Sequence, residues 1–115
     1  MKNKIAVISL TIVLSACGAV KLATPSDADA QRGSQKYPGL SLASLNEGKA
    51  LFEQNCARCH GLKDPTKRDE EKWNAVVPRM VKKVNKKVGH EEIDPKEQQL
   101  ILQYLVTMST VKPAK

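Results

Sequence analysis

The chain has 115 residues, enough for one small domain, and only 3% of them are aromatic. A core with so little aromatic mass is thin, so we expect the domain to need a disulfide, a metal or a large apolar ligand. The formal net charge of +7 falls to +5 when residues 1–16, which carry Lys2 and Lys4, are left out. This modest excess does not by itself indicate a nucleic-acid-binding protein.

The first residues have the order of a secretory signal: two lysines, an apolar run over 5–14, then small residues. Ten residues of helix span about 15 Å, half of a bilayer's hydrocarbon core, so a transmembrane span is not expected.

Residues 14–18, Leu-Ser-Ala-Cys-Gly, resemble the lipobox of bacterial lipoproteins. We predict a signal peptide over 1–16. The resemblance implies that Cys17 is lipidated and holds the exported protein on the periplasmic side of a bacterial membrane, with Gly18 favouring the outer one. An ordinary signal peptide with an incidental cysteine is the alternative.

Residues 17–43 are mostly small and polar, with little periodicity, which predicts a lipidated start followed by a flexible tether. The folded domain is expected over 44–110. Its first helix is predicted to begin at Ser44, where Ser44 and Glu47 have capping-box spacing, and to end near Asn55.

A second helical stripe begins at Trp73 and continues through Val77, Val81 and Val84 to Val88, with Asp69 as a candidate cap. Pro78 interrupts it, because proline lacks an amide donor and disfavours helix in the residue before it. The sequence therefore predicts two short helices or one kinked helix.

The last helix has a clear start at 94–97, Asp-Pro-Lys-Glu, which supplies an N-cap, a first-turn proline and a capping box. Leu100, Ile101, Tyr104, Leu105 and Met108 then share one face, and 111–115 is expected to be a tail. No segment has convincing strand alternation, so the predicted fold class is all-α.

The densest chemistry is at 56–60, Cys-Ala-Arg-Cys-His. Two cysteines spaced in this way form a redox dithiol or disulfide, hold zinc with further ligands, or attach a haem. A redox dithiol of this kind usually lies in an α/β fold of the thioredoxin type, and this sequence predicts no strands. A zinc site would need His90 as its fourth ligand, after Cys56, Cys59 and His60. In the haem interpretation Cys56 and Cys59 bond covalently to the porphyrin and His60 ligates the iron. This interpretation is compatible with export, and it supplies the apolar mass that the core lacks.

Residues 44–109 resemble the class I c-type cytochromes through Asn46, Gly48, Phe52, the 56–60 motif and Tyr104. The resemblance implies about three to five helices around one covalently bound haem c. It also implies that the first and last helices cross where Gly48 and Phe52 meet an aromatic residue, with Tyr104 the expected partner.

The sixth iron ligand has three candidates after His60: Met80, His90 and Met108. The family commonly places a methionine between the haem motif and the last helix, often just after a proline, and Met80 follows Pro78 closely. If they are not ligands, Met108 is expected to pack in the core on the last helix, and His90 is expected at the surface in a polar turn. This position leads us to expect Met80 as the ligand. A thioether favours reduced iron, so such ligation would raise the reduction potential.

The predicted function is electron transfer by a membrane-anchored, single-haem carrier, not an enzyme, with redox proteins as partners. Lys82, Lys83, Lys86 and Lys87 are expected to face away from Met80, as a solvated face or a docking surface for acidic partners. Arg58 and Arg79 are candidate partners of the haem propionates. The alternatives are a haem sensor or gas-binding protein with an open distal site, a haem subunit of a larger oxidoreductase, and a non-haem lipoprotein.

Overall fold

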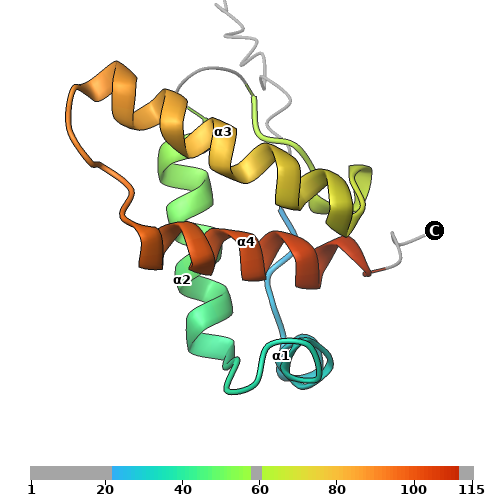
Figure 1. The fold of residues 1–115 in the computed structure, drawn as a ribbon. Helices are drawn as coiled ribbons and strands as arrows, with labels where there is room; N and C mark the ends of the chain where they lie inside the picture. The colour runs from blue at the N-terminus through green and yellow to red at the C-terminus, as the bar shows by residue number, and fades with distance from the viewer. Residues whose placement is uncertain (1–21, 58–60, 112–115) are drawn as a thin grey trace, which may run out of the picture.

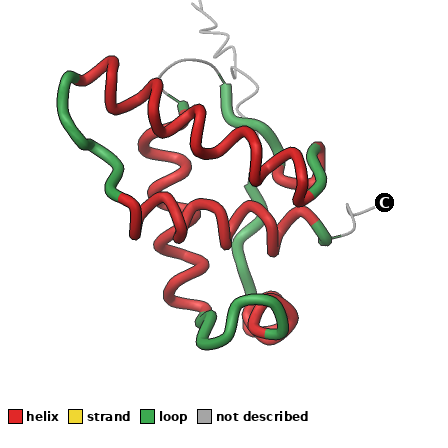
Figure 2. The backbone as a smooth tube through the Cα atoms, viewed as in Figure 1, coloured by secondary structure: helices red, strands yellow, loops and turns green. Residues whose placement is uncertain are grey.

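The computed structural model describes residues 22–57 and 61–111, and all regular structure within them is helical (Figures 1 and 2). The prediction of an all-α chain is therefore confirmed. The elements are α1 (Asp27–Ser34), α2 (Leu42–Cys56), the 3₁₀ helix η1 (Pro65–Lys67), α3 (Glu70–Val88) and α4 (Pro95–Ser109). Within the described ranges, no helix combines the length and apolar character that a bilayer crossing requires. The predicted signal peptide over 1–16, the lipidated Cys17 and residues 112–115 of the tail lie outside the described residues.

The centre of the fold is the place where α2 passes across α4 (Figure 1). Gly48 lies at the crossing: a Cβ added there would overlap the backbone carbonyl of Leu100 and come within 2.9 Å of the Tyr104 Cβ. One turn further along, the rings of Phe52 and Tyr104 pack with their centroids 6.2 Å apart. The expected contact between a small residue, an aromatic residue and Tyr104 is present. Glycine is a weak helix former, and this close approach explains its place in the middle of a helix.

The start of α2 differs from the prediction. Its N-cap is Ser41, whose hydroxyl accepts from the Ser44 N–H at 3.1 Å, while the Ser44 hydroxyl accepts from the Ser41 N–H at 2.9 Å. The capping box thus uses two serines, and Glu47 takes no part in it. A serine in the third helical position can replace the usual glutamate because its hydroxyl also reaches back to the capping residue.

The helix α3 is one continuous element, so of the two predicted forms the pair of short helices is excluded and a single helix is present. Pro78 and Asn74, whose carbonyl loses its usual donor, are both exposed, and water can satisfy that carbonyl. The Arg79 Nε donates to the Ala75 carbonyl at 3.3 Å, which adds a donor beside the gap. Asp69 caps the helix as expected, since its carboxylate accepts from the Lys72 N–H at 2.9 Å. The buried side is the expected stripe, with Trp73, Val77, Val81 and Val84.

The helix α4 begins as predicted, with Asp94 as N-cap, Pro95 in the first turn and a reciprocal hydrogen bond with Glu97. Ile101, Tyr104, Leu105 and Met108 are buried, and Leu100 is half-buried. Both α2 and α3 pack against this face, so α4 is the common support of the fold.

Residues 22–40 correct the prediction of a flexible tether, because they contain α1 and pack on the domain. Leu22 is buried, and Ser26 and Asp29 form a capping box. Arg32 donates to Asp29 Oδ1 at 2.8 Å, to the Thr107 carbonyl at 3.2 Å and to Thr110 Oγ1 at 3.0 Å. Partial burial opposes ionisation of Asp29, but hydrogen bonds from Ser26 and Arg32 outweigh it and lower the pKa of this carboxyl. The apolar residues of the segment are few, but Leu22 is in the core and Ala30, Tyr37 and Leu40 pack against it, and the polar contacts of Arg32 with the end of α4 add to this packing.

Candidate haem site

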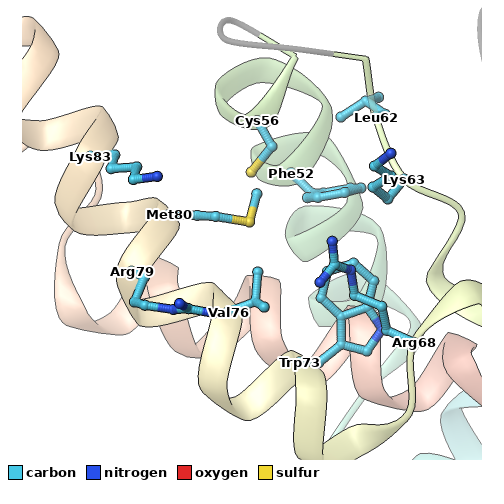
Figure 3. Close-up of a pocket in the computed structure, with 10 residues that line it drawn as sticks. All are labelled: Phe52, Cys56, Leu62, Lys63, Arg68, Trp73, Val76, Arg79, Met80 and Lys83. Carbon is cyan, nitrogen blue, oxygen red and sulfur yellow. The ribbon is translucent and has the colours of Figure 1, made fainter.

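A cavity of about 300 Å³ lies between α2, α3 and the segment that joins them (Figure 3). Its volume is at the lower end of the range usual for small-molecule sites. Each of the three walls combines apolar side chains with a reactive or charged one. The lining residues are Phe52, Cys56, Leu62, Lys63, Arg68, Trp73, Val76, Arg79, Met80 and Lys83.

Cys56 enters the cavity from the last turn of α2. It shares a helix face with Gly48 and Phe52, which lie eight and four residues earlier, and that face is turned towards the core. The side chain is 8% exposed. The crossing of α2 with α4 therefore fixes the position of the first cysteine of the 56–60 motif.

Met80 enters from α3 and extends towards Cys56 (Figure 3). It is half-buried, and its neighbours one turn away on the same side of the helix are Val76, Val77 and Val84. Cys56 and Met80 also border a second gap of about 10 Å³, closed by core side chains of α2, α3 and α4. The amphipathic stripe of α3 thus places the Met80 thioether on the wall that faces the Cys56 thiol of α2.

The other two ligand candidates lie elsewhere. Met108 is 3% exposed in the core face of α4 and does not line the cavity. His90 follows α3, with a side chain that is 65% exposed, and its Nε2 lies 2.9 Å from Glu92 Oε2. Of the three candidates in the described residues, Met80 alone lines the cavity that Cys56 enters.

Trp73 forms the floor of the cavity and is held from two sides. Its indole Nε1 donates to the Pro65 carbonyl at 2.9 Å, and its ring meets Phe52 edge-on, with centroids 6.3 Å apart and planes at 83°. The Arg68 guanidinium carbon lies 5.4 Å from the centre of the Trp73 ring, within the range of a cation–π contact. An aromatic floor of this kind is rigid and apolar, with the one polar atom of the indole already satisfied.

Among the described residues, four cations line the cavity, Lys63, Arg68, Arg79 and Lys83, and no acidic residue does. Lys83 corrects the prediction that the lysines of this helix face away from Met80: it is three residues from Met80 and therefore on the same side. Lys82, Lys86 and Lys87 are exposed and do not line it. Helical spacing alone could have identified Lys83. No sequence signal places Lys63 and Arg68, because an irregular segment carries both.

The rest of the 56–60 motif, Cys59 and His60 with Arg58, lies outside the described residues. The nearest described residues with a place in the site are Cys56 before this gap and Leu62 after it, and both line the cavity. Within the described ranges, 22–57 and 61–111, no group of three His, Cys, Asp or Glu side chains is placed to hold a metal ion.

The described residues fit a haem by the chemistry of their side chains. A thiol can bond to the porphyrin edge, a thioether is a suitable ligand for iron, and aromatic and aliphatic side chains suit an apolar ring. The cations suit two carboxylates. Cys56 and Met80 would hold the group, together with Cys59 and His60 of the same motif.

No family model, no curated protein and no solved structure matches this chain. A function for this chain therefore has to be inferred from its residues and from the cavity that they form.

Proposed function

We propose that this protein transfers electrons as a single-haem c-type cytochrome, anchored through Cys17 to the periplasmic side of a bacterial membrane. The observation that carries the proposal is that Cys56, the first residue of the proposed haem-attachment motif, lines the same cavity as Met80. In this proposal Cys56 and Cys59 bond to the porphyrin, and His60 and Met80 ligate the iron. The haem supplies one-electron chemistry between Fe(III) and Fe(II).

The residues of the chain support this role by holding one geometry. Met80 extends from a 19-residue helix that packs against α4, so the thioether has a fixed support. Trp73 and Phe52 keep the cavity floor apolar. With two protein ligands on the iron no position is left for a substrate, which favours a carrier over an enzyme.

The first test is to produce the full chain in cells that attach haem to exported proteins, and to denature it. Haem that stays with the polypeptide supports the proposal, and a chain that carries a Cys56–Cys59 disulfide and no haem contradicts it. A Cys17→Ser variant should leave the membrane fraction if the lipid anchor is present.

The second test concerns the iron ligand. Met80→Ala should abolish the sulfur-to-iron absorption band near the red end of the spectrum, whereas Met108→Ala should retain it. The reduced protein should bind carbon monoxide poorly at neutral pH, and the Met80→Ala variant should bind it readily. Ready binding by the unaltered protein would instead indicate a haem sensor or gas-binding protein.

A further inference from the structure

We propose that Asn85 is a positioning residue for Met80: its carboxamide holds the second half of α3, and so keeps the thioether in its place at the cavity. The inference rests on the proposed function, in which Met80 ligates the iron. It concerns a side chain that does not itself line the cavity.

The Asn85 side chain makes two hydrogen bonds with one residue of the loop that follows α3. Its Nδ2 donates to the Ile93 carbonyl at 3.0 Å, and its Oδ1 accepts from the Ile93 N–H at 2.9 Å. A carboxamide suits this pairing because it offers a donor and an acceptor side by side. Ile93 is 1% exposed, so the loop to which Asn85 is bonded is anchored in the core.

The backbone of Asn85 also marks the end of α3. Its carbonyl accepts from the Gly89 N–H at 3.0 Å, and Gly89 has a φ of 81°, in the left-handed region that ends many helices. The chain then turns back towards α4, whose N-cap, Asp94, follows Ile93 directly (Figure 1). Asn85 therefore joins the end of α3 to the start of α4, five residues after Met80.

The middle of α3 is the place where the helix resists bending least. Its first half is held by Trp73, which is 1% exposed and bonded to the Pro65 carbonyl. Pro78 then supplies no amide donor for the Asn74 carbonyl, and prolines are the usual sites at which helices bend. Met80 lies two residues beyond Pro78, so its position depends on how the second half of the helix is held.

The second half combines apolar packing with the Asn85 bonds. Val81 and Val84 are buried at 7% and 5% exposure, whereas Met80 is half-buried at the cavity. Apolar contacts are not directional, and they permit small tilts of a helix. Hydrogen bonds set both a distance and a direction. Loss of the Asn85 bonds should therefore free the Met80 wall to move while the core packing remains.

The first experiment measures how quickly cyanide binds to the ferric, haem-loaded chain. Cyanide reaches the iron only after Met80 dissociates from it, so the rate reports on the hold of the thioether. Asn85→Leu keeps a similar volume and removes both bonds, and it should raise the rate about tenfold. Asn74→Leu makes the same change at an exposed position before Pro78, and should leave the rate unchanged. A parental rate in Asn85→Leu would overturn the inference.

A double variant shows whether Asn85 acts through Met80. In a Met80→Ala background there is no thioether to displace, so addition of Asn85→Leu should change the cyanide rate by less than about twofold. A tenfold increase that persists in this background would mean that Asn85 controls access to the haem in general. That result would also overturn the inference.

A second measurement does not use the iron. Hydrogen exchange is followed by mass spectrometry on the full chain as it is isolated. In Asn85→Leu the amides of 79–88 should exchange at least about fivefold faster, while those of 73–77 keep their parental rates. An equal increase in both halves of α3 would mean that Asn85 only stabilises the whole domain, and would contradict a positioning role.

The outcomes separate this inference from the proposed function. A chain that retains covalent haem but shows parental cyanide and exchange rates in Asn85→Leu overturns the inference alone. A chain isolated without haem contradicts the cytochrome proposal, and hydrogen exchange then still decides whether Asn85 holds the half of α3 that carries Met80.

Discussion

The α2–α4 crossing and the cavity beside it differ in how completely the polypeptide fills them. At the crossing, Gly48 allows backbone to meet backbone, and Tyr104 and Leu105 are fully buried. At the cavity, Val76, Met80 and Leu62 are only half-buried, and four cations are among the described lining residues. The two regions share Phe52, which packs on Tyr104 on one side and on Trp73 on the other.

The difference indicates that the crossing is the part of the domain that the chain stabilises by itself. The cavity has the composition of a site that gains its contacts from a bound group, since apolar walls open to water are unfavourable. Changes at the crossing should therefore reduce stability whether or not haem is present, and changes at the cavity should depend on it.

Phe52→Ala should have the largest effect, because it removes the side chain that both regions share. Loss of a buried phenylalanine typically lowers the free energy of unfolding by about 3–5 kcal/mol. Urea denaturation followed by Trp73 fluorescence measures the change. Leu51→Ala, a half-buried neighbour on the same helix, is the control and should cost less than half as much. Equal losses would mean that Phe52 does not link the two regions.

Gly48→Ala should come next. A methyl group at this position overlaps the Leu100 carbonyl, so the helices must separate, and overpacking of this kind costs about 1–3 kcal/mol. Ala50→Gly, at an exposed position of α2, calibrates helix propensity and should cost about 1 kcal/mol. A Gly48→Ala variant more stable than the parent would show that the crossing is looser than described.

Adjacent valines on α3 test the contrast most directly. Val77 is 2% exposed in the core, and Val77→Ala should cost about 2 kcal/mol in the chain without haem. Val76 is half-buried in the cavity wall, and Val76→Ala should cost less than about 1 kcal/mol there. In the haem-loaded chain the cost of Val76→Ala should rise. Similar costs for both valines without haem would remove the distinction between the regions.

Tyr104 should give the smallest effect at neutral pH. Its hydroxyl is buried and has no hydrogen-bond partner among the described residues, so Tyr104→Phe should leave stability unchanged or raise it by up to about 1 kcal/mol.

The same residue makes a pH prediction. Burial, and then the charges of Glu53 and Asp64, raise the pKa of the Tyr104 phenol above its ordinary value. The folded state therefore keeps this proton after the unfolded chain has lost it. Stability should be unaffected below about pH 10 and fall by about 1.4 kcal/mol per pH unit above it. The free energies of unfolding of the parent and of Tyr104→Phe, measured between pH 8 and 11, should diverge only at the upper end of this range. The divergence should correspond to the titration of roughly one group. Parallel curves would show that the phenol is hydrated.

Sequence reasoning was most successful where the signal is local. The start of α4 and the buried stripe of α3 follow from capping residues and helical spacing, and both are present in the structure. The sequence did not predict α1. Arg32 of this helix bonds to Thr107 and Thr110, which are 75 and 78 residues away, and no local pattern reveals such contacts.

The candidate site shows the same limit. Cys56 and Met80 could be selected from motif and spacing, and the structure places both on one cavity. Arg68 and Lys63 could not, because their positions depend on the Pro65 carbonyl and on how the segment after residue 61 folds back over Trp73. Pro78 left the prediction divided between two short helices and one kinked helix. A single helix forms because the usual cost of an internal proline is reduced where the carbonyl that loses its donor, that of Asn74, faces water.

The Arg32 contacts also determine how a pulling force would travel through an anchored molecule. Leu22 is buried only five residues after Cys17, so the proposed lipid and the fold are at most about 17 Å apart along an extended chain. A pull on the membrane side would load α1 first and then, through Arg32, the last turn of α4. A second path runs through the ion pair between Lys36 and Glu70, which joins the same segment to the first turn of α3. The proposed anchor would thus be coupled mechanically both to α4 and to the helix that carries Met80.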